Sequence, residues 1–254
     1  MPLQPVERRS LGDQVFDQLS AQILHGELEA GATLPAERAL VALLGVNRQA
    51  VREAIKRLEQ AGLVDVHHGG GTTVTDWRRR AGLDLIPTLI VTADGTVDPA
   101  VVRSIMELRA AVGPEVAARC AERMVPAVKA ALAELADRYT TIGDTTSIHD
   151  LGALDVALWD ALVEGSDNIA FRLAYNALRD ESAAAEGIVR QLLAEEVSAI
   201  GLRTLLIDRV MDGDVDGARD SAAELLALGT AAITRAMAGA TTTSRPKARR
   251  GGAR

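Results

Sequence analysis

The stretch LPAERALVALLGVNRQAVREAIKRLEQAGLV, residues 34–64, predicts two helices joined by a tight turn. Pro35 stands near the first turn of the first helix, where its missing amide hydrogen would have had no partner in any case. Gly45 breaks the helical pattern, and Asn47 is a good N-cap for a second helix that runs to about Gln60. The two helices are therefore expected to meet at a tight turn.

The second of these helices has an apolar face and a polar face. Its apolar residues recur at i, i+3, i+4 and i+7, the spacing of a stripe that faces a core. They are Val51, Ala54, Ile55 and Leu58. The residues on its other faces are basic or carry an amide, and they are Arg48, Gln49, Arg52 and Lys56. This polar face must point to solvent or to a ligand.

The flanking sequence completes a familiar order of elements. Apolar residues at helical spacing from Leu11 onward predict an earlier helix that ends near His25 and Gly26. After the second helix of the pair, residues 63–67 and 72–75 alternate as two strands around the Gly-rich turn 68–71. A helix, a helix, a turn, a helix and a hairpin predict a winged helix-turn-helix over residues 1–76.

The polar face of the second helix has the chemistry of a DNA contact. A helix fits the major groove, arginine can donate two hydrogen bonds to guanine, and amides can pair with adenine. An ordinary solvated helix face would show the same basic composition, but the preceding helix, the tight turn and the hairpin favour DNA. The candidate contacts are Asn47, Arg48, Gln49 and Arg52.

The remainder of the chain is predicted to be helical, with helices that include 168–193 and 195–211, so the fold class is mainly α. Ala, Leu and Val dominate the apolar residues, and aromatic residues make up only 2% of the chain, a composition that favours closely packed helices. We expect a linker over residues 77–82, an all-helical second domain over 83–239, and a basic disordered tail over 240–254.

Charge and cysteine content limit the class of protein. The net charge of −7 is uneven, because residues 1–80 hold ten basic and ten acidic residues, residues 81–240 are acidic, and residues 241–254 hold five basic residues and no acidic ones. A DNA role therefore depends on local charge. Cys120 is the single cysteine, and we find neither a signal peptide nor an apolar run of membrane-spanning length. We expect a cytoplasmic protein with no membrane partner.

The first domain resembles the GntR-type transcription regulators in three strings, which are LPAER (34–38), LGVNRQAVREAIKRLEQAGLV (44–64) and HGGGTTV (68–74). The resemblance implies that Arg38, Arg48 and Arg52 contact DNA, with Arg38 mostly on phosphate. It also implies that His68 and Gly69, at the tip of the hairpin, enter the minor groove. A Gly-rich turn would form the hairpin without any such function.

The second domain resembles the FadR-like subgroup, through an E-L-R opening at 107–109, Asp155 before an apolar helix, a Ser-x-Asn turn at 166–168 and a late Gly-Asp turn at 213–214. The resemblance implies that residues 83–239 are an effector-binding and dimerisation domain, in which many members of the subgroup bind a metal through this Asp and three His. Here the expected His four residues after Asp155 is Trp159, and the later positions fall near Arg203 and Leu225. His149 is the single histidine of this domain, so we expect neither a metal nor another cofactor.

The missing histidines shape the expected effector. A pocket with Trp159 projecting into it suits a hydrophobic ligand, and acyl-CoA-responsive members of the subgroup also lack the metal site, so we expect a long-chain acyl-CoA or fatty acid. Arg109 either pairs with an effector carboxylate or phosphate or forms an ordinary salt bridge. Phe171 and Tyr175 are expected in the core rather than in the ligand site.

The expected mechanism is that of a homodimer bound to a short palindromic operator in double-stranded DNA, its affinity set by the effector. Three alternatives remain open at this stage. They are a regulator that binds a small carboxylate without metal, an architectural DNA binder without an effector, and an enzyme with an attached DNA-binding domain. The last is disfavoured because no nucleophile, base and orienting group stand at a recognisable spacing.

Overall fold

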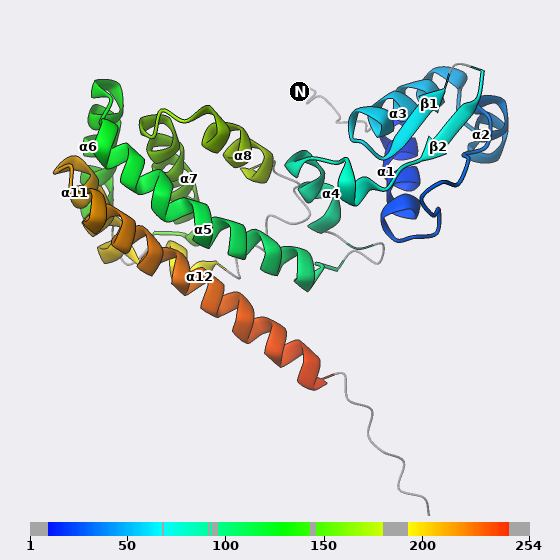
Figure 1. Ribbon diagram of the computed structural model, residues 1–254. Helices are drawn as coiled ribbons and strands as arrows, with labels where there is room; N and C mark the ends of the chain where they lie inside the picture. The colour runs from blue at the N-terminus through cyan, green and yellow to red at the C-terminus, as the bar shows by residue number, and fades with distance from the viewer. Residues whose placement is uncertain are drawn as a thin grey trace, which may run out of the picture. The chain divides into compact units, whose positions relative to one another are not determined.

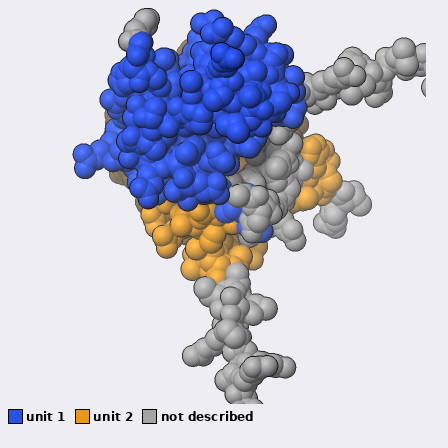
Figure 2. Space-filling model, turned by 90° about the vertical axis from the view of Figure 1, so that its right-hand side faces the viewer, with its two compact units in different colours: residues 1–96 blue, residues 97–254 orange. Residues whose placement is uncertain are grey.

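The computed structural model describes residues 10–67, 69–90, 92, 96–142, 146–179 and 193–243. Contacts between Cα atoms divide the chain into two compact units, residues 1–96 and residues 97–254, which Figure 2 colours separately. Each unit has its own core and is described by itself.

In the first unit, three helices are followed by a two-stranded hairpin (Figure 1). The helices are α1 (Leu11–Leu24), α2 (Glu37–Leu44) and α3 (Arg48–Gln60), and the strands are β1 (Val64–His67) and β2 (Gly71–Val74). The two strands are antiparallel, with Val64 opposite Val74, and an isolated bridge joins Thr33 to Thr73. The winged helix-turn-helix order predicted from the sequence is confirmed.

The apolar stripe of α3 lies in the core of the first unit. Val51, Ala54 and Leu58 have no exposed surface, and they cluster with Leu19 of α1. The packing of α1 against α3 is the most extensive contact between helices of this unit. Each fully buried Leu or Val stabilises the fold by about 1.5–3 kcal/mol, so this stripe fixes how α3 is turned.

The corner between α2 and α3 follows from two residues. Gly45 ends α2 with φ of 66°, in the left-handed region that L side chains rarely adopt. Asn47 begins α3 as its N-cap, and its side-chain oxygen accepts a hydrogen bond from the amide of Ala50 at 2.9 Å. The sequence prediction for this corner holds in both details.

The segment that follows the hairpin groups with the first unit. It contains two 3₁₀ turns, η1 (Trp77–Arg79) and η2 (Leu83–Leu85), and the short helix α4 (Ile86–Ile90). Leu85 is 3% exposed and belongs to the same core as α1 and α3. The linker expected at 77–82 therefore lies inside the first unit, and the division between the units falls after Thr96.

The second unit is all-helical, as predicted. Its helices are α5 (Pro99–Arg123), α6 (Pro126–Thr140), α7 (Ile148–Gly165), α8 (Ile169–Arg179), α10 (Ala194–Val197), α11 (Ile200–Met211) and α12 (Val215–Thr243). The long helices α5 and α12 lie side by side and form the most extensive contact of the unit (Figure 1). Its core combines buried residues of α5, α6, α7, α11 and α12.

Two small residues allow α5 and α7 to approach closely. A Cβ at Gly165 of α7 would lie only 2.4 Å from the sulfur of Cys120 on α5. Cys120 is fully buried, and burial raises the pKa of its thiol to about 12. The thiol therefore stays protonated and serves as a small apolar side chain.

The helix boundaries of the second unit differ from those predicted from the sequence in two places. The expected helix over 195–211 is interrupted at Ser198 and Ala199, which separate α10 from α11. Helix α12 continues to Thr243, into the segment expected to be a disordered tail, whereas residues 244–254 lie outside the described residues. Residues 180–192, expected within a helix that follows Asn168, also lie outside them.

Replacement of Gly45 by Ala should destabilise the first unit by about 1–2 kcal/mol, because the left-handed conformation brings Cβ close to a carbonyl oxygen. Gly45→Asn should cost less, since Asn tolerates this conformation. Urea unfolding of the full chain in a Trp159→Phe background reports on Trp77, the one remaining tryptophan, in the first unit. Equal stability of the Ala and Gly proteins would contradict the assigned role.

Candidate functional site

The polar face of α3 presents two exposed arginines. The side chains of Arg48 and Arg52 are 75% and 68% exposed, and they lie one helical turn apart. Gln49 is exposed beside Arg48. Because Val51 and Leu58 are buried on the opposite face, these polar groups are directed to solvent. Three of the four α3 candidates thus form one basic, amide-bearing surface.

One carboxylate lies against both arginines. Oε2 of Glu37 accepts a hydrogen bond from Nε of Arg48 at 3.2 Å, and its Oε1 lies 3.6 Å from Nε of Arg52. Arg38, the next residue of α2, is exposed in the first turn of that helix. Glu37 stands in the same LPAER string as Arg38, but it was not among the site residues predicted from the sequence.

Asn47 and the hairpin tip differ from the other candidates. The oxygen of Asn47 is used to cap α3, so its NH₂ group is what it can offer to a base. Gly69 is exposed in the hairpin turn with φ of 80°, and the amide of Gly70 donates to the carbonyl of His67 at 3.1 Å. The predicted minor-groove contact His68 lies outside the described residues.

Other basic residues of the first unit are held by acids or aromatic rings. Arg57, at the end of α3, pairs with Asp13 and stacks over the ring of Phe16 at 4.2 Å. Within the run 78–80, Arg79 pairs with Asp76 and Arg80 with Asp65. Arg48 and Arg52 are paired as well, with Glu37, so what sets them apart is their place together on the open face of α3.

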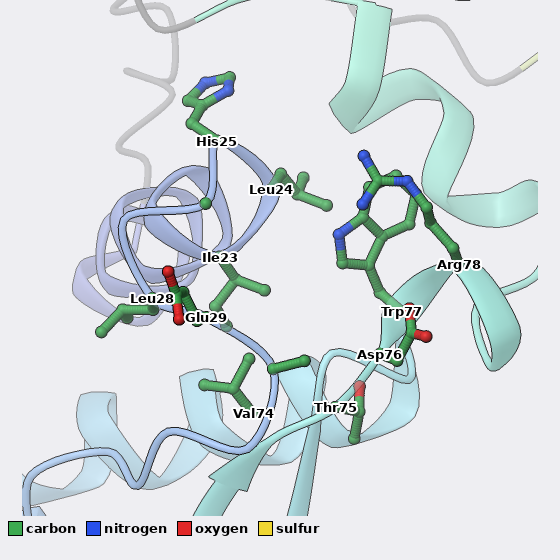
Figure 3. A pocket seen from close by; sticks show the side chains of 12 residues that line it. Ile23, Leu24, His25, Leu28, Glu29, Val74, Thr75, Asp76, Trp77 and Arg78 are labelled. Atoms are coloured by element: carbon green, nitrogen blue, oxygen red, sulfur yellow. The ribbon is translucent and has the colours of Figure 1, made fainter.

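A pocket of about 240 Å³ lies between the end of α1 and the end of β2 (Figure 3). Ile23, Val74 and Trp77 form its apolar lining, and His25 and Asp76 stand at it. Ile23 and Val74 also belong to the core of the unit. The pocket is thus a gap at the edge of the core, without a paired set of catalytic side chains.

In the second unit, the structure joins Asp155 to Arg203. Oδ1 of Asp155 accepts a hydrogen bond from Nη2 of Arg203 at 2.6 Å, and Nη1 of Arg203 donates to the carbonyl of Glu196. Arg203 is fully buried and Asp155 is 13% exposed. A guanidinium therefore stands beside the carboxylate that the resemblance would give to a metal.

A second buried ion pair adjoins the first. Nη2 of Arg109 donates to Oε1 of Glu196 at 2.6 Å, and the Glu196 side chain is fully buried. Burial raises the pKa of Glu196, and the neighbouring Arg109 acts in the opposite direction. Gly229 makes room for this carboxylate, because a Cβ there would lie 2.0 Å from Oε2 of Glu196. Arg109 thus forms an internal salt bridge, one of its two predicted roles.

Three buried polar atoms near these pairs have no hydrogen-bond partner among the described residues. They are the hydroxyl of Tyr139, Nε1 of Trp159 and Nε of Arg203. Burial raises the pKa of Tyr139, and the charge of Arg203 lowers it, which places the two groups close together. An unsatisfied buried donor costs about 1–3 kcal/mol, so these groups would gain from an acceptor.

The remaining candidates of the second unit have structural contacts. Trp159 is 8% exposed, and its ring lies against Gly113 of α5, where a Cβ would be 3.2 Å from the ring. Phe171 and Tyr175 pack against the core, and the Tyr175 hydroxyl donates to the carbonyl of Val156 at 3.1 Å. His149 is exposed in the first turn of α7.

The described residues hold neither a cluster of metal ligands nor a membrane-spanning helix. Within them, no group of three or more His, Cys, Asp or Glu side chains is placed to hold a metal ion. Across the same part of the chain, no helix combines the length and the apolar character needed to cross a membrane.

Two family patterns match this sequence. Residues 11–74 match "Bacterial regulatory proteins, gntR family", and residues 104–228 match "FCD domain". The first range covers α1 to β2 and therefore the exposed face of α3. The second covers most of the helical unit, including both buried ion pairs.

Three relatives illustrate the range of similarity. The HTH-type transcriptional regulator Mce2R of Mycobacterium tuberculosis is 42% identical over 92% of this chain and 95% of its own length. A putative L-lactate dehydrogenase operon regulatory protein of Escherichia coli is 32% identical over 83% of this chain and 81% of its own. A fatty acid metabolism regulator protein of Vibrio cholerae is 34% identical over 36% of this chain and 33% of its own.

Replacement of Asp155 by Asn should destabilise the second unit by about 3–5 kcal/mol, because it leaves a buried guanidinium without its countercharge. Asp155→Leu combined with Arg203→Met should recover most of this loss, since neither charge then remains. Urea unfolding in a Trp77→Phe background, followed by Trp159 fluorescence, measures both. Asp208→Asn, an exposed change on α11, is the control, and an equal effect there would refute the assignment.

Proposed function

Because the chain belongs to the gntR family of bacterial transcription regulators and carries an FCD domain, we propose that it binds an operator through α3 and releases or holds it in response to an effector in the helical unit. The observation that carries the DNA role is the pair of exposed arginines, Arg48 and Arg52, on a helix whose opposite face is buried. The chemistry is that of binding rather than catalysis.

The proposed DNA contacts divide by the groups they meet. Arg48, Gln49 and Arg52 would donate to base edges in the major groove, since their side chains share the open face of α3. Arg38, in the first turn of α2, would contact a phosphate. Asn47 would add its amide to the base contacts, and the hairpin tip with His68 and Gly69 would enter the minor groove.

A homodimer on a short palindrome is the proposed assembly. One helix with two arginines and an amide contacts few base pairs, which is too few to specify an operator. A two-fold dimer doubles the contacted sequence and places the two halves about one helical turn apart. The acidic second unit, whose net charge repels DNA, is the part proposed to hold the dimer together.

Alanine at Arg48 or Arg52 should weaken operator binding by about 1–3 kcal/mol each and relax specificity at the base it contacts. Arg38→Ala should weaken binding to all sequences about equally, because phosphates carry no sequence information. Binding to a duplex selected from a random library measures these effects. Arg103→Ala, an exposed arginine of α5, is the matched control and should change nothing; unaltered binding by Arg48→Ala and Arg52→Ala would refute the proposal.

The helical unit is proposed to bind an effector with an acidic group. Arg109 and Arg203 are cations that reach its interior, and each is held by a carboxylate of the protein. An effector carboxylate or phosphate is the chemical equivalent of those partners and could take their place. Tyr139, Trp159 and Arg203 supply three further donors that have no acceptor among the described residues.

A fatty acid or its acyl-CoA is the effector class we favour. Trp159, Leu158 and Leu162 give the surroundings of Asp155 an apolar character that suits an acyl chain. A small carboxylate bound without metal is the second candidate, supported by the arginines and by the longer similarity to the L-lactate dehydrogenase operon regulatory protein. Effector and operator affinities would be coupled reciprocally, so each ligand changes the binding of the other by the same factor.

Titration with a long-chain acyl-CoA or fatty acid should lower the affinity for the selected duplex and raise the melting temperature of the free protein. Lactate and related small acids are the competing arm, and a response to them alone would replace the fatty-acid proposal with the second candidate. Absence of any response to either class would favour an effector-independent architectural protein.

Tyr139→Phe separates a binding role from a structural one. The variant removes a buried hydroxyl that makes no hydrogen bond of good geometry among the described residues, so it should change stability little. If that hydroxyl donates to the effector, affinity for the effector should fall about fivefold to tenfold. Melting curves and effector titrations of the same preparation test both statements, and unchanged effector affinity would exclude Tyr139 from the site.

A further inference from the structure

Glu37 places a negative charge on the surface proposed for DNA, which is itself an anion. Its side chain is 34% exposed, and its two oxygens face the Nε atoms of Arg48 and Arg52 at 3.2 and 3.6 Å. A carboxylate at this position weakens the attraction of both arginines for phosphate. Its presence therefore needs an explanation other than affinity.

The contact engages only the inner edge of each guanidinium. The Nε atom is the nitrogen nearest the helix, so a partner there leaves Nη1 and Nη2 farther from the backbone. No described residue accepts a hydrogen bond from the terminal nitrogens of Arg48 or Arg52. Those two nitrogens form a parallel pair of donors, and guanine offers the matching pair of acceptors at O6 and N7.

We propose that Glu37 is a positioning residue that makes Arg48 and Arg52 selective for bases over phosphates. It holds the two Nε atoms, so the terminal donors point away from the helix. Its charge also reduces the net positive charge of the surface, which lowers binding to DNA of any sequence. This inference rests on the proposed function of α3.

A purely structural role is the competing explanation. Glu37 is the first residue of α2, and an acidic side chain near a helix N-terminus stabilises the helix by about 0.3–1 kcal/mol. That role predicts a loss of stability when the charge is removed, but it predicts no change in the ratio between affinities for two DNA sequences. The ratio is therefore the informative measurement.

The experiment compares the full chain with Glu37→Gln, Glu37→Asp and the control Glu59→Gln. Glu59 lies on α3 itself, is exposed, and its side chain has no contact with Arg48 or Arg52. Each protein is titrated with a duplex selected by the unmodified chain and with a random-sequence duplex, at several salt concentrations. Thermal melting confirms that each variant is folded.

Glu37→Gln should bind the random duplex about threefold to tenfold more tightly and with a steeper dependence on salt, because the surface gains effective positive charge. The ratio of selected to random affinity should fall about tenfold. Glu37→Asp keeps the charge but cannot reach both arginines, so its random-duplex affinity should stay near that of the unmodified chain while the ratio falls. Glu59→Gln should leave the ratio unchanged.

Three results would overturn the inference. The first is a ratio for Glu37→Gln within about twofold of the unmodified chain. The second is an equal fall for Glu59→Gln, which would assign the effect to net charge alone. The third is a Glu37→Gln protein that still selects guanine but prefers a different base at one other position, because Glu37 would then itself contact that base. Loss of DNA binding in Arg48→Ala combined with an unaltered ratio in Glu37→Gln would refute this inference but not the proposed function.

Discussion

The burial of one stripe of α3 controls the DNA-facing surface of this protein. Val51 and Leu58 have no exposed surface, and burial of each such side chain stabilises the first unit by about 1.5–3 kcal/mol. An exposed ion pair contributes only about 0–1 kcal/mol. Once that stripe faces α1, the helical period turns Arg48 and Arg52 to the opposite side. The core thus determines the direction of the arginines, and Glu37 adjusts only the pose of their side chains.

The second unit differs from the first because its interior contains charged side chains. Arg203 and Glu196 are fully buried, and neither would be stable in a helical core without a partner of opposite sign. Asp155 and Arg109 supply those partners at 2.6 Å each. Replacement of such pairs by apolar residues often costs little, so the pairs are a poor source of stability and a better candidate for recognition.

Much of the first unit could be predicted because its signals are local. The N-cap Asn47, the glycine at position 45 and the spacing of the α3 stripe each determine structure within a few residues. The contacts of Glu37 with α3 and the inclusion of Leu85 in the core join residues distant in sequence, and no periodicity reports them. Likewise, the missing histidines predicted a pocket around Asp155, and Arg203 was identified only as the residue near a later ligand position. The pairing of Arg203 with Asp155 could not be predicted, because the two residues lie on different helices and are distant in sequence.

The close approach of α5 and α7 at Cys120 and Gly165 links the evolution of two positions. A side chain at residue 165 has no room while a thiol occupies residue 120, and a larger residue at 120 has no room beside the α7 backbone. Glycine cannot become smaller, so a larger residue at 120 has no compensation, and a side chain at 165 needs a smaller residue at 120 and also at Val128, whose Cγ1 would lie 2.9 Å from the new Cβ. Among homologous chains, a residue larger than glycine at position 165 should therefore be accompanied by smaller residues at positions 120 and 128.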